Sequence, residues 1–170
     1  MSRIFWCLTL ACFSFAGCGY HPQPQGALLT GLGNGGVHIR IFDNKSYRTG
    51  LETKLTDSIV AEFARRSGGM VTGEDIAQML LSGTVLSYTT APASFTAADK
   101  IREYRASIKV KAVLKQKNTQ DVRWKGELSR NQVYPVNSDI SLQQNAEDAA
   151  IQEICNKLAL DLWQKLNEDF

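Results

Sequence analysis

The chain has 170 residues, of which 44% are hydrophobic and 21% are charged, a composition typical of a globular protein rather than a disordered one. Its formal net charge of +2 excludes a molecule-wide positive field that would gather nucleic acid, so any basic site has to be local. The length is sufficient for one hydrophobic core without disulfide staples, and composition favours a single domain.

The N-terminal residues have the pattern of an export signal. Arg3 makes the start positive, and residues 4–16 form an apolar stretch that is short of the roughly 20 residues needed to span a bilayer. The following Phe15-Ala16-Gly17-Cys18 resembles the lipobox of bacterial lipoproteins, with Phe15 in place of the usual leucine. We therefore predict that residues 1–17 are cleaved and that Cys18 carries the lipid. A plain secretory signal with an incidental cysteine is the alternative.

Residues 18–36 are predicted to connect the lipid to the folded part. The run is rich in glycine and proline, and such compositions behave as tethers. Gly19 follows the cysteine, and by resemblance to lipoproteins of Gram-negative envelopes the absence of aspartate there implies sorting to the outer membrane. A single folded domain is expected over residues 37–170.

The first half of that domain predicts a strand and a helix. Residues 37–42 alternate, with Val37, Ile39 and Ile41 on one face, and residues 43–46 form a turn. Thr49 and Glu52 match a capping box, so a helix is expected from there to about residue 66. Its apolar stripe recurs every fourth residue, at Leu51, Leu55, Ile59 and Phe63.

The second half predicts three strands and a helix. Strands are expected over residues 79–88, 104–114 and 122–133, with a polar loop at 89–101 and a hairpin turn at 117–120. The strand at 104–114 alternates most clearly, which is typical of an antiparallel sheet with one wet face. Val122, Trp124 and Leu128 are assigned to the apolar side of the last strand. A final helix over about 143–166 has the stripe Ile151, Ile154, Cys155, Leu158, Leu162 and Leu166.

The order β-α-β-β-β-α predicts an α+β fold. Two amphipathic helices and a four-stranded, mainly antiparallel sheet with one apolar face should form a two-layer sandwich, because each element must bury its apolar side against another.

No set of residues in the sequence indicates catalysis. The chain has no nucleophile elbow, no Walker loop and no HExxH zinc motif. After removal of the signal, only Cys155 remains in the folded part, and His21 and His38 are the only histidines. These numbers are too small for a disulfide framework or a metal site. We therefore expect no enzyme activity, no cofactor and no metal.

The fold pattern and the search for catalytic motifs do not account for a group of basic residues. They gather on the third and fourth predicted strands and the loop before them, and an ordinary solvated sheet face is one interpretation. The other is a cationic face for phosphate groups, which lysine and arginine bind through charge-assisted hydrogen bonds. For an exported lipoprotein, a phosphorylated envelope glycolipid is a better ligand than nucleic acid. The candidates are Lys100, Arg102, Arg105, Lys109, Lys111, Lys115, Arg123 and Lys125.

A set of short segments, in this order and spacing, resembles the lipopolysaccharide-assembly lipoproteins of the LptE family. No single segment is specific, but together they cover nearly the whole mature chain. They are Cys18-Gly19-Tyr20-His21, Ile39-Arg40-Ile41-Phe42-Asp43-Asn44, Tyr47 with Gly50-Leu51-Glu52 and Leu55-Thr56, Leu81-Ser82-Gly83-Thr84-Val85, and Glu103-Tyr104-Arg105.

The resemblance implies a location and partners. The protein would be anchored by its lipid on the periplasmic side of the outer membrane, support the β-barrel translocon LptD, and assist delivery of lipopolysaccharide to the surface. The alternative from another class is an outer-membrane lipoprotein that activates a peptidoglycan synthase. The tether of about 16 residues reaches at most roughly 50 Å, which is short for that task.

Overall fold

The computed structural model describes residues 35–67 and 71–168. The predicted signal, Cys18 and most of the tether lie outside these residues. The elements are β1 (Val37–Ile39), β2 (Asp43–Asn44), α3 (Leu51–Ser67), β3 (Met79–Phe95), β4 (Ile101–Gln116), β5 (Val122–Pro135) and α4 (Ile140–Glu168). Their order confirms the predicted β-α-β-β-β-α arrangement.

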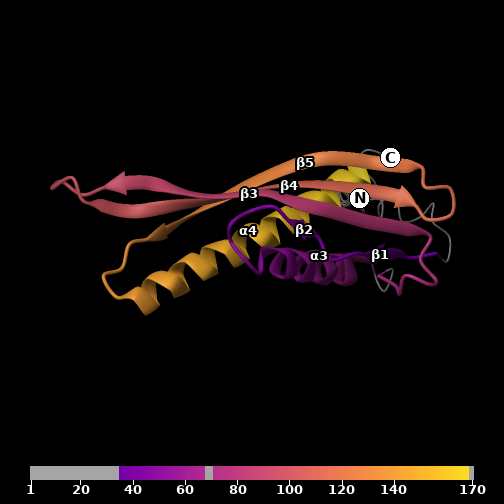
Figure 1. The fold of residues 1–170 in the computed structure, drawn as a ribbon, viewed down its shortest axis with the longest axis horizontal. Coiled ribbons are helices and arrows are strands. Elements are labelled where there is room, and N and C mark those ends of the chain that lie inside the picture. The colour runs from indigo at the N-terminus through magenta and orange to yellow at the C-terminus, as the bar shows by residue number, and fades with distance from the viewer. Residues whose placement is uncertain (1–34, 68–70, 169–170) are drawn as a thin grey trace, which may run out of the picture.

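Both helices cover the same face of one sheet, so the fold has two layers (Figure 1). The sheet order is β1-β3-β4-β5, and β2 also pairs with β3. The strands β3, β4 and β5 form an antiparallel meander, whereas β1 and β2 run parallel to β3. The sheet is therefore mixed and has five strands rather than four, because the predicted first strand is divided into two short pieces.

That division exchanges the roles of two neighbouring residues. Ile41 was assigned to the inner face, but its side chain is 72% exposed, and Phe42 is buried with 2% exposed. Ile39 lies opposite Leu81 and Asp43 lies opposite Thr84, so the edge strand has one more residue than β3 over this stretch. An extra residue of this kind reverses the alternation beyond it.

The interactions around Phe42 stabilise the irregular edge. Its backbone N–H donates to Thr56 Oγ1 at 3.1 Å, which satisfies a donor that the ladder no longer pairs. The Thr56 hydroxyl in turn donates to the Glu52 carbonyl at 2.6 Å. The Phe42 ring lies over Gly83, where a Cβ atom would be 2.2 Å from the ring. Gly83 therefore provides the space that buries Phe42.

The helix α3 begins where predicted, but with a different cap. The Gly50 carbonyl accepts the first intrahelical hydrogen bond, from Lys54 N–H, so Gly50 rather than Thr49 is the N-cap residue. Gly50 has a φ of 81°, a conformation that suits glycine. The Glu52 carboxylate accepts from Asn44 Nδ2 at 2.7 Å, and this bond joins the helix start to β2.

The segment 89–101 is mostly strand and not the predicted loop. β3 continues to Phe95 and pairs with β4 along its whole length, and only the turn from Thr96 to Lys100 closes the hairpin. Small and polar residues form strand here because the neighbouring β4 supplies the hydrogen-bond partners. The hairpin extends beyond the rest of the molecule (Figure 1).

The core lies between the sheet and the helices. The predicted stripes of α3 and α4 are all buried, including Cys155, and the even-numbered residues of β4 from Ala106 to Leu114 form the opposing surface. Val122 departs from prediction because its side chain is 54% exposed. The register shifts between Leu114 and Lys115, so Val122 lies beyond an irregular pair rather than in step with Trp124.

Candidate functional site

The candidate site is the outer face of the sheet, opposite the helices. Arg105, Lys109 and Lys111 alternate with buried residues of β4 and therefore lie together on this face. Lys125 of β5 lies opposite Val113 and joins them. Lys115, which follows the buried Leu114, shares the same face. The structure thus brings five of the predicted basic residues onto one surface.

An acidic residue lies among these bases. Glu127 is opposite Lys111, and its carboxylate forms an ion pair with Lys109 at 2.7 Å. The hydrogen bond from Lys109 lowers the pKa of Glu127, and the charges of Lys109, Lys111 and Lys125 lower it further. Lys109 is therefore already engaged, whereas Lys111 and Lys125 keep ammonium groups available for an external anion.

The other predicted residues lie apart from this surface. Lys100 is in the turn at the hairpin tip, and Arg102, which the sequence placed in a loop, belongs to β4. Because strand residues alternate, Arg102 is on the face opposite Arg105. Arg123 is the extra residue at the irregular pair of β5 and is exposed.

Hydroxyl groups line the neighbouring strand on the same face. Ser82, Thr84, Ser87 and Thr89 of β3 lie opposite outward residues of β4, beside the row of bases. Hydroxyl and ammonium groups on one surface can both donate to phosphate and sugar oxygens. No local sequence pattern indicates this row, because the register of β3 against β4 decides which residues of β3 share the face.

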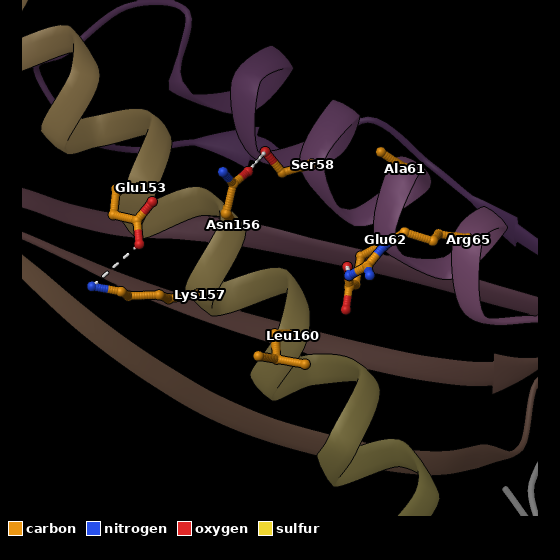
Figure 2. A pocket seen from close by; sticks show the side chains of 8 residues that line it. All are labelled: Ser58, Ala61, Glu62, Arg65, Glu153, Asn156, Lys157 and Leu160. Carbon is orange, nitrogen blue, oxygen red and sulfur yellow. Dashed lines mark hydrogen bonds and ion pairs between the residues drawn. The ribbon is translucent and has the colours of Figure 1, made fainter. Parts of the chain in front are cut away.

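A groove of about 420 Å³ lies between α3 and α4 on the side away from the sheet (Figure 2). Ser58 donates to Asn156 Oδ1 at 3.2 Å across it, and Glu153 pairs with Lys157 at 3.4 Å. Glu62 is paired with Arg65. The charged side chains that line the groove are therefore paired with one another. The groove presents no group of reactive side chains that point toward a common centre.

A second polar cluster joins β3 to α4 at the edge of the core. The Tyr88 hydroxyl donates to Glu147 at 2.6 Å, and Arg48 pairs with Asp148 at 3.0 Å. Burial, together with the bond to Glu147, raises the pKa of Tyr88 above its usual value. These partners are far apart in sequence, so no local pattern indicates them, and their arrangement is that of a structural link.

The buried thiol also has a structural environment. Burial raises the pKa of Cys155 to about 11, which keeps it protonated near neutral pH. Over residues 35–67 and 71–168, no three potential metal-ligating side chains gather, and no helix is long and apolar enough to cross a membrane.

Comparison with known proteins identifies the family. The sequence profile of LptE, described as lipopolysaccharide-assembly, matches residues 35–166. The chain belongs to the LptE family. The resemblance seen in the sequence is thereby confirmed, and membership places this chain among proteins of lipopolysaccharide assembly.

Solved structures agree with this fold. A protein from Caulobacter crescentus CB15 is similar, with a TM-score of 0.54 and 11% identity over 83% of this chain and 93% of that one. A Xanthomonas campestris protein has a TM-score of 0.53 and 13% identity over 75% and 80% of the two chains. The uncharacterized lipoprotein B from Nitrosomonas europaea has a TM-score of 0.52 and 12% identity, over 78% of this chain and 82% of that one. No curated protein sequence matches the chain.

Proposed function

We propose that this LptE-family protein is an outer-membrane lipoprotein, anchored through Cys18, that partners an LptD-like β-barrel and contacts lipopolysaccharide phosphates through its outer sheet face. Family membership supports the barrel partner. The observation that supports lipid contact is the joint position of Arg105, Lys111 and Lys125 on a surface that neither helix covers.

Affinity purification tests the barrel partnership. Tagged protein isolated from detergent-solubilised outer membrane is expected to bring down a large β-barrel at a fixed stoichiometry. Recovery of a peptidoglycan synthase without a barrel would contradict the proposal and favour the alternative class of lipoprotein.

Charge reversal tests the lipid contact. We expect Arg105→Glu with Lys111→Glu to weaken lipopolysaccharide binding at least about tenfold, because hydrogen bonds to charged groups contribute about 1.5–3 kcal/mol each. The matched control is Lys45→Glu with Lys165→Glu, which makes the same charge change at exposed positions away from this face.

The assay needs conditions that separate binding from general attraction. It should be run near physiological ionic strength, because exposed charges attract any anion when salt is low. Lipid A without phosphates serves as the second ligand. If both pairs of substitutions weaken binding equally, or if wild type binds both lipids equally, the outer face does not recognise phosphate.

The anchor is tested by Cys18→Ala. We expect this variant to incorporate no labelled palmitate and to be lost from the outer-membrane fraction. Its fold should remain intact, because residue 18 precedes the first strand. Palmitate incorporation at the wild-type level would exclude Cys18 as the attachment site.

A further inference from the structure

The chain enters the folded domain from the predicted tether at one end of the sheet. The Gly36 carbonyl accepts two backbone hydrogen bonds there, from Gln78 at 3.0 Å and from Met79 at 3.2 Å. Gly35 lies so close to the Gln78 side chain that a Cβ atom would not fit between them. The point of entry is therefore beside the segment 73–78, which leads into β3.

Two loops form this end of the domain and are bonded to each other. The segment 73–78 precedes β3, and the turn 117–121 connects β4 to β5 (Figure 1). The backbone N–H of Lys117 donates to the Gln78 carbonyl at 2.8 Å, and its ammonium group donates to the Asp75 carbonyl at 3.0 Å. We call this surface, made of residues 35–36, 73–78 and 117–122, the entry end.

Two large apolar side chains are exposed on the entry end. Ile76 is 67% exposed, and Val122, the first residue of β5, is 54% exposed. Lys117 lies between them along the bonded loops, and Arg123 follows Val122. Aliphatic side chains beside long basic ones are typical of protein surfaces that lie at the boundary between lipid headgroups and acyl chains.

Charge alone would not bring this surface to a membrane. The exposed acids Asp75 and Asp121 accompany Lys117 and Arg123, so positive and negative groups are mixed. Attraction to anionic lipids grows with the number of bases on a surface and is therefore small here. Burial of the two apolar side chains has to supply most of any contact with lipid.

The predicted tether determines which apolar partner is near. Residues 19–34 separate Cys18 from Gly35, and a glycine-rich run of this length has a root-mean-square span of about 20–24 Å. A contact made by a domain held so close to a surface is intramolecular, so even a weak one is populated. The lipid around the anchor is therefore the nearest apolar environment for Ile76 and Val122.

The opposite end of the domain is also apolar, but it is far from the point of entry. Val136, Ile140 and Leu142 are exposed around the start of α4. Helix α4 has 29 residues, which corresponds to a length of about 43 Å, and its start lies at the end of the molecule away from the entry end (Figure 1). Bringing that end to the anchor would extend the predicted tether close to its maximum reach.

We propose that, in the lipoprotein without its barrel partner, the entry end lies on the lipid bilayer. Ile76 and Val122 insert at the boundary between headgroups and acyl chains and form a second contact beside the anchor. A single acyl anchor combined with such a surface contact is the usual way in which stable membrane attachment is built. This inference rests on the proposed anchor at Cys18.

Quenching by spin-labelled lipid tests the contact. The purified lipidated protein is reconstituted into vesicles of phosphatidylethanolamine and phosphatidylglycerol that contain a nitroxide lipid. A fluorophore is attached to Asn118→Cys at the entry end or to Ser141→Cys at the start of α4, and the buried Cys155 stays unlabelled. We expect the nitroxide to reduce emission from residue 118 at least about twofold and to leave emission from residue 141 unchanged.

Matched double substitutions identify the side chains. Ile76→Ser with Val122→Ser should abolish quenching at residue 118, whereas Ile140→Ser with Leu142→Ser should leave it intact. All four side chains are exposed, so circular dichroism melting should show that each variant keeps its fold. An unquenched label at residue 118, stronger quenching at residue 141, or quenching that survives the first double substitution would overturn the proposal.

Flotation of the vesicles separates this contact from the anchor. Wild type and both double variants should float with the vesicles equally, because their lipid is the same. Wild-type protein that does not float refutes the anchor and the surface contact together. Protein that floats without quenching at residue 118 refutes the surface contact and leaves the anchor standing.

Discussion

The two faces of β4 come from one stretch of sequence and differ in what they require. Toward the helices, Ile108 and Leu114 are almost fully buried, and the row from Ala106 to Leu114 contains no charge. Toward solvent, Arg105 and Lys111 stand beside hydroxyl groups of β3. The inner row is specified by packing, which any apolar set of suitable volume can satisfy. The outer row is free of that constraint, so its chemistry is available for binding.

The largest expected effect comes from placing a charge on the inner face. Ile108→Asp should unfold the chain, because an unpaired buried charge costs several kcal/mol against a total stability of about 5–15 kcal/mol. The adjacent Ser107→Asp, on the outer face, should change stability by about 0.5 kcal/mol or less. Urea unfolding followed by circular dichroism distinguishes them, and equal midpoints would contradict the two-layer packing.

The irregular edge offers a sharper form of the same comparison. Phe42→Ala should cost about 3–5 kcal/mol, typical for a buried phenylalanine. Ile41→Ala, one residue earlier, should stay within about 0.5 kcal/mol because its side chain is 72% exposed. Simple alternation predicts the reverse order. The free energies of unfolding of the two variants therefore test whether the extra residue at this edge exists.

The smallest effect concerns the phenols at the end of the core. Burial raises the pKa of Tyr134 to about 12 and that of Tyr88 above its usual value of 10.0. The unfolded chain ionises these groups at lower pH than the folded chain, so the free energy of unfolding should fall as the pH rises above about 10.

Replacing both phenols by phenylalanine isolates this contribution. The variant Tyr88→Phe with Tyr134→Phe should lose less stability than wild type between about pH 9 and pH 11. Urea titrations at a series of pH values provide the slopes. Parallel slopes for the two proteins would mean that the hydroxyls titrate equally in the folded and unfolded states.

Sequence alone predicted the elements whose pattern is local. The stripe of α3 from Leu51 to Phe63 follows from helical periodicity, and the two faces of β4 follow from strict alternation. The exchange of Ile41 and Phe42 could not be predicted, because an extra residue is defined only against the partner strand. The extent of β3 beyond residue 88 was missed for the same reason, since its small and polar residues need β4 to form strand.

The candidate site was also predicted only where the sequence pattern is local. Alternation grouped Arg105, Lys109, Lys111 and Lys115 correctly. The strand was expected to begin only at residue 104, so Arg102 was counted as a loop residue beside them, whereas β4 begins at Ile101. Glu127 carried a usable signal, because it lies two residues from Lys125 in a strand and therefore shares its face. Its ion pair with Lys109 depends on the register between β4 and β5, which no local pattern determines.

The parallel edge described above also bears on the order in which the chain folds. The meander of β3, β4 and β5 closes through short turns, whereas Val37 must find Met79 across a segment that includes all of α3. Contacts between distant residues carry a larger loop-closure entropy and form more slowly. We expect the meander to assemble first and β1 to dock last. The final step of folding then takes place beside the N-terminal segment, at the end of the chain that is predicted to hold the protein on the membrane.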